Sequence, residues 1–252
     1  MCFDVDSSPP VPPVAGAAVS HEELVLEARD GNRLAAFLAT PDEQARTGIV
    51  VLPDVRGLYR FYEELALRFA ERGYAAIAVD YYGRTAGVEK RDDDFDYAPH
   101  RDATNDETVQ ADVAAAVAKL RDLGCEAVLT VGFCFGGRNS WIAAASSHGL
   151  AGAAGFYGSP TRALRGDRSV VARAGEIACP ILALQAGADA GITAEDNAAL
   201  DAALDEAGVE HEVVTYEGAP HSFFDRKQEE FAEASDDAWR RVLAFVEQHA
   251  AA

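Results

Sequence analysis

The sequence predicts an α/β fold with a mostly parallel, twisted sheet, helices on both faces and an N-terminal hairpin. From residue 48 onward, short apolar runs alternate with longer segments whose apolar residues recur at helical spacing. The short runs are apolar almost throughout, as expected for parallel strands that are covered by helices on both faces. With 252 residues and no internal repeat or domain-length linker, the chain is expected to form a single domain.

The elements follow one another in a regular order. Residues 1–17 are Pro-rich and are expected to form an extended or loosely packed arm, and residues 18–252 form the domain. Two apolar runs flank Asp30-Gly31-Asn32, which is typical of a hairpin turn. The remaining strands are expected at 48–53, 74–79, 127–133, 151–158, 180–187 and 211–218, and the helices at 60–72, 107–122, 135–147, 194–207 and 231–245.

Composition narrows the class of partner. The 22 basic and 42 acidic residues give a formal net charge of −20, which argues against nucleic acids and anionic membrane surfaces. The sequence has no apolar stretch long enough to span a bilayer and does not begin like a secretory signal. Its four cysteines are scattered without C-x-x-C spacing, so neither a zinc site nor a disulfide framework is expected. We expect a cytoplasmic protein, a monomer or small homo-oligomer, that acts on a small molecule.

The first candidate site residue is Cys134. In open α/β sheets, ligands bind outside the carboxyl ends of the strands, and Cys134 follows one of the predicted strands directly. It lies within Gly132-Phe133-Cys134-Phe135-Gly136-Gly137, where flanking glycines allow a sharp strand-to-helix turn. The start of the following helix favours a thiolate there. The alternative is a buried structural cysteine in a glycine-lined turn.

Two further candidates follow later strands. Asp189 comes just after the strand at 180–187, and His221 follows the strand at 211–218. Taken alone, an aspartate in this place also suits a turn or a helix N-cap, and a histidine also suits a surface position. Taken together with Cys134, they have the order nucleophile, acid, histidine that is typical of the α/β-hydrolase arrangement.

The end of the strand at 48–53 supplies the fourth candidate region. An oxyanion hole needs the backbone N–H of the residue after the nucleophile, Phe135, and a second N–H from an early turn, for which Val55 is our candidate. Asp54 would then stand beside the nucleophile, able to accept the thiol proton. The alternative is a loop aspartate paired with the neighbouring Arg56.

From about residue 22 to 248, the chain resembles the dienelactone hydrolase family, the cysteine-using members of the α/β-hydrolase fold. The resemblance rests on G-x-C-x-G-G at 132–137, "GAD" ending at Asp189, "GAPHSF" around His221 and "AVDYYGR" at 78–84. It implies that Cys134, Asp189 and His221 form a catalytic triad and that no metal or organic cofactor is needed.

The resemblance also implies roles for two other residues. A carboxylate at the place of Asp54 would activate the thiol, and an arginine at the place of Arg84 would hold a carboxylate of the substrate. Arginine suits this role because its planar fork matches a carboxylate, although a surface arginine paired within an acidic protein is the alternative. The sequence departs from the family twice: Asp54 stands where Glu is typical, and Asp225 followed by Arg226 stands where an anion-binding arginine is expected.

The expected activity is hydrolysis of a small ester or lactone, with or without a carboxylate group, through a cysteine thioester. This is the carboxymethylenebutenolidase type of carboxylic ester hydrolase. Two alternatives stay open from the residues: an acyltransferase that uses the same cysteine turn, and a non-catalytic relative that only binds a ligand in the pocket.

Overall fold

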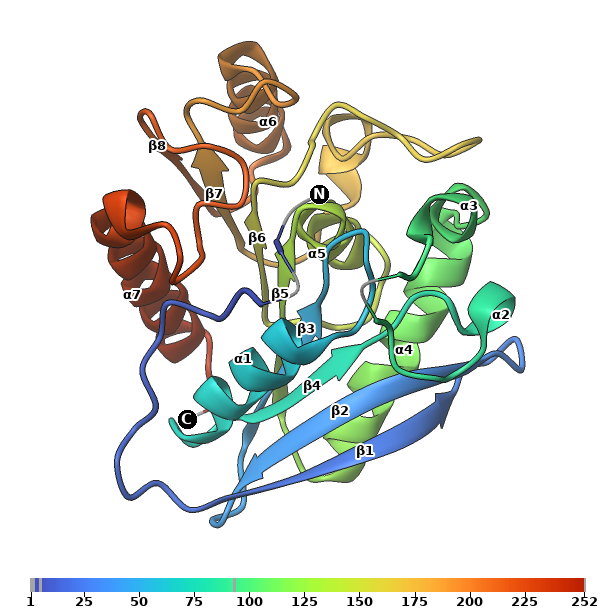
Figure 1. Cartoon of the computed structure of the whole chain (residues 1–252). Helices are drawn as coiled ribbons and strands as arrows, with labels where there is room; N and C mark the ends of the chain where they lie inside the picture. The colour runs from blue at the N-terminus through green and yellow to red at the C-terminus, as the bar shows by residue number, and fades with distance from the viewer. Residues whose placement is uncertain (1–2, 5, 93, 252) are drawn as a thin grey trace.

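A single twisted sheet organises the computed structural model, which describes residues 3–4, 6–92 and 94–251 (Figure 1). It has eight strands in the order β1-β2-β4-β3-β5-β6-β7-β8. The edge strand β1 pairs antiparallel with β2, β2 joins β4 antiparallel, and every other pairing is parallel. The strands are β1 (Val19–Glu27), β2 (Arg33–Pro41), β3 (Thr47–Leu52), β4 (Ala75–Val79), β5 (Ala127–Phe133), β6 (Gly152–Phe156), β7 (Ile181–Ala186) and β8 (His211–Tyr216).

Helices cover both faces of this sheet. They are α1 (Arg60–Ala70), α2 (Gly83–Ala86), α3 (Tyr97–Asp102), α4 (Asp106–Asp122), α5 (Phe135–Ala144), α6 (Ala194–Ala207) and α7 (Ala232–Gln248), with 3₁₀ turns η1 (Val171–Glu176) and η2 (Glu229–Phe231). Because side chains alternate along a strand, Val51 packs in the core under α1 and α7, while Val50 packs in the core under α4. The central strands are therefore apolar on both faces, as predicted.

The predicted α/β architecture is confirmed, with the hairpin, the parallel strands and the five long helices close to their expected positions. The helix after Cys134 ends at Ala144, earlier than expected, and Ser147 has the left-handed φ of 56°. The short helices α2 and α3 were not predicted, because four to six residues are too few to show a 3.6-residue period.

The N-terminal arm is packed more closely than its Pro-rich composition suggests. Its described residues between 3 and 17 form turns but no helix or strand. However, Phe3 and Val11 are each only 2% exposed, and the Phe3 ring stacks on Phe61 with centroids 4.1 Å apart. These apolar side chains anchor the arm to the core around α1.

The parallel strands bring their carboxyl ends to one edge of the sheet. Leu52 at the end of β3 lies in register with Gly132 near the end of β5, and Ala186 of β7 lies in register with Tyr216 of β8. The segments that follow these strands therefore meet at the same edge. None of the described helices has both the length and the apolar character that crossing a bilayer requires.

Candidate active site

Cys134 occupies a strained turn between β5 and α5. Its backbone adopts φ 53° and ψ −109°, a conformation that residues other than glycine rarely adopt. A Cβ atom at Gly132 would lie 2.0 Å from the Gly136 carbonyl oxygen, and one at Gly136 would lie 2.0 Å from the Leu52 carbonyl oxygen. The turn thus requires both glycines, and it lifts the thiol above the end of the sheet.

The environment of Cys134 differs from that of the other described cysteines. Cys134 is half-buried at the N-cap of α5, where unpaired N–H groups and the helix dipole favour negative charge. Cys125 and Cys179 are buried away from the site, and burial raises the pKa of each thiol to about 11. Cys134 is therefore the described cysteine best placed to react as a thiolate.

His221 and Asp189 form a close pair beside this turn. The His221 Nδ1 atom lies 2.5 Å from Oδ2 of Asp189, and the Gly191 N–H donates to the other carboxylate oxygen at 2.7 Å. Burial would raise the pKa of Asp189, but the hydrogen bonds from His221 and Gly191 hold it below its ordinary value. With Asp189 ionised, Nδ1 is the donor and Nε2 remains for proton transfer.

The electrostatics of His221 depend on two partners. Burial opposes protonation of the ring, but the hydrogen bonds with Asp189 and with Cys134 outweigh it and raise the pKa of His221 to about 9. The Tyr157 ring packs against the imidazole with centroids 4.8 Å apart. The structure therefore brings Cys134, His221 and Asp189 together in one connected group.

Asp54 lies fully buried behind the thiol. Its Oδ1 atom accepts a hydrogen bond from the Arg56 N–H at 2.8 Å, and its Oδ2 atom accepts one from the Tyr59 hydroxyl at 3.1 Å. Burial and the negative charge of a Cys134 thiolate raise the pKa of Asp54 to about 7. Arg56 thus contacts Asp54 through its backbone N–H.

Three tyrosines hold the turn at residues 53–55. The Asp54 N–H donates to the Tyr62 hydroxyl at 2.9 Å, the Tyr81 hydroxyl donates to the Pro53 carbonyl at 2.9 Å, and the Tyr82 hydroxyl donates to the Val55 carbonyl at 2.6 Å. Sequence reasoning missed this role. The adjacent tyrosines directly after the strand ending at Val79 were the available signal, since functional side chains concentrate at strand ends.

A cavity of about 270 Å³ opens in front of the thiol. It is lined by Val55, Arg101, Cys134, Phe135, Arg138, Tyr157, Ser159, Arg162, Ala163, Leu164, Asp189, Gly191, Ile192 and His221. Phe135 is the first residue of α5, so its N–H has no acceptor within the helix. Both backbone groups that we expect to form an oxyanion hole belong to residues that line this cavity.

The family model for the dienelactone hydrolase family matches residues 34–250. The chain belongs to this family. It is 28% identical over 239 residues to "Putative carboxymethylenebutenolidase" of Yersinia pestis, covering 87% of this chain and 85% of that one. The same description applies to a Saccharolobus solfataricus protein that is 28% identical over 262 residues, with 89% and 98% covered.

Solved structures agree with the fold of this dienelactone hydrolase family member. The "Putative Dienelactone Hydrolase" from Klebsiella pneumoniae superposes with a TM-score of 0.80 at 28% identity, over 92% of this chain and 99% of that one. A dienelactone hydrolase-like promiscuous phosphotriesterase from metagenomic libraries has a TM-score of 0.79 at 21% identity, over 94% of this chain and 100% of that one, and shows the fold alone. The α/β-hydrolase fold expected from the sequence is confirmed.

Arg84 does not line the cavity, although the family resemblance placed it at the substrate. Its guanidinium lies 2.7 Å from Asp30 in the β1–β2 turn and 2.6 Å from the buried Asp112 of α4. Arg226 is likewise directed elsewhere, since its N–H and guanidinium donate to the carbonyls of Ser8 and Pro9. The expected substrate role of Arg84 therefore does not fit this structure, in which the arginine fastens the hairpin turn to α4.

Other arginines line the cavity that sequence reasoning did not identify. Arg138 is buried and its guanidinium is bound by Asp106 at 2.7 Å. Arg162 is exposed and donates to the Gly191 carbonyl at 3.0 Å, and Arg101 pairs with the exposed Asp102 at 2.6 Å. Arg101 lies in the short helix α3, Arg138 in α5 and Arg162 in a loop, and no shared sequence pattern links them, so only their three-dimensional placement reveals them.

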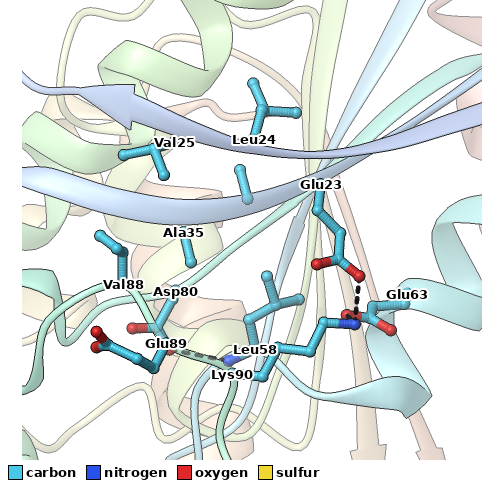
Figure 2. Close-up of a pocket in the computed structure, with 11 residues that line it drawn as sticks. Glu23, Leu24, Val25, Ala35, Leu58, Glu63, Asp80, Val88, Glu89 and Lys90 are labelled. Atoms are coloured by element: carbon cyan, nitrogen blue, oxygen red, sulfur yellow. Dashed lines mark hydrogen bonds and ion pairs between the residues drawn. The ribbon is translucent and has the colours of Figure 1, made fainter.

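A second cavity, of about 230 Å³, lies between the β1–β2 hairpin and residues 88–90 (Figure 2). The Lys90 side chain extends along it, and its amine pairs with Glu23 at 2.6 Å and Glu63 at 3.0 Å. Among the described residues that line it there is no cysteine, serine or histidine. Across the described ranges, no group of three or more His, Cys, Asp or Glu side chains is placed to hold a metal ion. The cavity at Cys134 is therefore the better candidate for chemistry.

Proposed function

We propose that this protein hydrolyses a small ester or lactone through a thioester formed on Cys134. Membership of the dienelactone hydrolase family supports a hydrolase of the lactone or ester type. The observation that carries the proposal is the connected group of Cys134, His221 and the buried Asp189 at the end of a strained strand-to-helix turn. Such a group is the nucleophile, base and orienting acid of acyl transfer.

Acylation begins with the thiolate. The Cys134 proton passes to His221 or Asp54, and the sulfur attacks the carbonyl carbon of the ester. The N–H groups of Phe135 and Val55 donate to the oxyanion that forms. When the carbon–oxygen bond breaks, the imidazolium of His221 gives its proton to the departing alkoxide, which in a lactone stays attached as the ring-opened alcohol.

Deacylation needs His221 as a base. The thiolate is one of the groups that raise the pKa of His221 to about 9, and its negative charge disappears when the thioester forms. The pKa of the ring then falls, so the neutral imidazole can take a proton from water. The resulting hydroxide adds to the thioester carbonyl, the carbon–sulfur bond breaks and the thiolate of Cys134 is restored.

The direct test is Cys134→Ala. The purified variant should keep the circular dichroism spectrum and the denaturation midpoint of the unmodified protein while losing hydrolysis of small aryl esters. In the unmodified protein, rapid quenching and mass spectrometry should detect one acyl group on the peptide that contains residue 134. A folded Cys134→Ala protein that is equally active would exclude the mechanism.

The cavity also supports an anionic group on the substrate, with Arg162 and Arg101 as its partners in place of Arg84. Arg162 is exposed, and Arg101, whose side chain is 39% exposed, pairs with the exposed Asp102, so both guanidiniums are accessible from the cavity. Leu164 and Ile192 give the same cavity apolar walls. Arginine forms forked hydrogen bonds with carboxylates, which gives orientation as well as charge attraction.

A matched series of aryl esters and lactones with and without a carboxylate tests this assignment. The unmodified protein should prefer the anionic member of each pair, and Arg162→Ala and Arg101→Ala should reduce that preference. Arg84→Ala is the matched control and should keep it. A preference that disappears in Arg84→Ala, or no preference in the unmodified protein, would contradict the assignment.

A further inference from the structure

The N-terminal arm contacts the two segments that carry candidate catalytic groups. One anchor joins it to Arg56, two residues after Asp54, and the other joins it to residues 225–227, shortly after His221. In Figure 1 the arm passes from the region near β5 and β6, beside α1 and α7, to the start of β1.

The first anchor is built on Phe3. The Phe3 carbonyl accepts a hydrogen bond from the Arg56 guanidinium at 2.6 Å, and the buried Phe3 ring is stacked on Phe61. Arg56 is the residue whose N–H donates to Asp54 Oδ1. Its guanidinium also lies 5.2 Å from the centre of the Tyr59 ring, and the Tyr59 hydroxyl donates to Asp54 Oδ2. Both oxygens of the carboxylate are therefore held by groups that Arg56 touches or provides.

The second anchor fixes the segment after His221. The Ser7 hydroxyl donates to Oδ2 of the buried Asp225 at 2.7 Å, and the Arg226 N–H donates to the Ser8 carbonyl at 3.0 Å. Hydrogen bonds to an ionised carboxylate are among the stronger ones in proteins. The arm is thus held at Phe3 and again at Ser7 and Ser8, which limits the freedom of Phe3 and its carbonyl.

We propose that the arm positions the base that activates the thiol: Phe3 holds Arg56, and Arg56 holds Asp54 against Cys134. This inference rests on the proposed thiolate chemistry. The step is a proton transfer from the Cys134 sulfur to a carboxylate oxygen of Asp54 and needs no other reactant. The groups that face Asp54 are Cys134 at the N-cap of α5, Arg56 and Tyr59 from its own segment, Tyr62 from α1, and Tyr81 and Tyr82 after β4.

Loosening the arm should make Asp54 a poorer base. Asp54 is fully buried, and burial is the main reason that its pKa is raised. If Phe3 no longer holds Arg56, water reaches the carboxylate and its pKa falls toward the ordinary value. The carboxylate then also loses its fixed position, and a misplacement of about 1 Å can lower a catalytic rate by a factor of about 100.

The experiment measures how fast iodoacetamide alkylates Cys134 between pH 5 and 9, by mass spectrometry of the intact full chain. A Cys2→Ser background removes one competing thiol, and Cys125 and Cys179 are buried. The test variants are Phe3→Ala and Arg56→Gln. Arg56→Lys keeps one donor for the Phe3 carbonyl, and Arg60→Gln is the matched control because Arg60 pairs with Glu64 on the outside of α1.

We expect Phe3→Ala and Arg56→Gln to slow alkylation at pH 7 by about tenfold, and to move the inflection near pH 7 to lower pH by about half a unit or more. For aryl ester hydrolysis, kcat should fall to a similar extent with little change in KM. Arg56→Lys should recover part of the rate, and Arg60→Gln should match the background protein.

Alkylation does not require turnover, so it separates this inference from the proposed function. An unchanged alkylation profile in a folded Phe3→Ala protein would overturn the role of the arm, even if Arg56→Gln had an effect. Phe3→Leu keeps a large apolar side chain and replaces the alanine variant if that variant does not fold. Phe3→Leu should slow alkylation less than Arg56→Gln does, and a profile shifted as far as in Arg56→Gln would contradict the role of the arm. Retained activity in Cys134→Ala would instead overturn the proposed function.

Discussion

Replacing Asp54 with Asn should make the protein more stable at neutral and alkaline pH. Asp54 is 0% exposed, and burial and the Cys134 charge raise its pKa from 3.8 to about 7. The native state therefore disfavours the charged carboxylate. Below pH 3.8 the group is protonated in both states and contributes nothing, whereas above pH 7 it is ionised in both and destabilises the native state. A shift of roughly 3 pKa units corresponds to about 4 kcal/mol.

The asparagine variant removes this charge with little change in shape. Its amide oxygen can accept from the Arg56 N–H, and its amide nitrogen can donate to the Tyr59 hydroxyl, so both hydrogen bonds of the carboxylate have replacements. The variant and the unmodified protein should be equally stable near pH 4. Between pH 4 and pH 7 their difference in unfolding free energy should grow toward about 4 kcal/mol in favour of Asp54→Asn.

Urea denaturation at several pH values checks this, with the fluorescence of the buried Trp141 and Trp239 as the signal. Asp196→Asn is a control of opposite sign, because hydrogen bonds from Thr161 and the Thr193 N–H lower the pKa of Asp196. That variant should lose stability at neutral pH and match the unmodified protein in acid. A pH-independent difference for Asp54→Asn, or a variant less stable at pH 8 than the unmodified protein, would refute the reasoning.

Three further changes test separate parts of the structure. Asp189→Asn should lower the pKa of His221 from about 9, measured by NMR titration of the ring, and reduce kcat by about 10³- to 10⁴-fold. The raised pKa of His221 stabilises the fold fully below about pH 6.5, and this stabilisation is lost above about pH 9. The difference in unfolding free energy between the unmodified protein and Asp189→Asn should therefore become smaller as the pH rises through this range. Gly136→Ala places a Cβ atom 2.0 Å from the carbonyl at the end of β3 and should lower the melting temperature sharply, whereas Gly175→Ala meets open space and should not. Arg84→Ala leaves a buried carboxylate without its ion-pair partner and should cost about 2 kcal/mol in a denaturant titration, with the substrate preference unchanged.

The arrangement of Cys134, Asp189 and His221 could be predicted because it follows from the topology of the sheet. Each residue lies in the segment that follows a parallel strand, and the carboxyl ends of parallel strands meet at one edge. The glycines at 132 and 136 add a local constraint that is visible in the sequence, since no side chain fits there. At these residues, the local sequence pattern and the overall fold predict the same strand-to-helix turn and the same edge of the sheet.

Arg84 shows where such reasoning fails. Its motif identified the residue type and its place after β4, but not the direction of a long side chain with several acidic neighbours. In the fold, Asp30 and Asp112 come from segments distant in sequence, and together they bind the guanidinium. Arg101 reaches the cavity from the short helix α3 and Arg162 from a loop, and neither segment has a period of apolar residues that indicates which way a side chain points.

Net charge is informative about the surface but not about the cavity at Cys134. The chain has 42 acidic and 22 basic residues, yet among the described residues three arginines and a single carboxylate, Asp189, line that cavity. That carboxylate is already engaged by His221, so it offers little repulsion to a bound anion. Local charges act most strongly at short range, because salt screens interactions beyond about 8–10 Å. An acidic protein can therefore repel polyanions at its surface while its cavity attracts a single small anion toward the thiol.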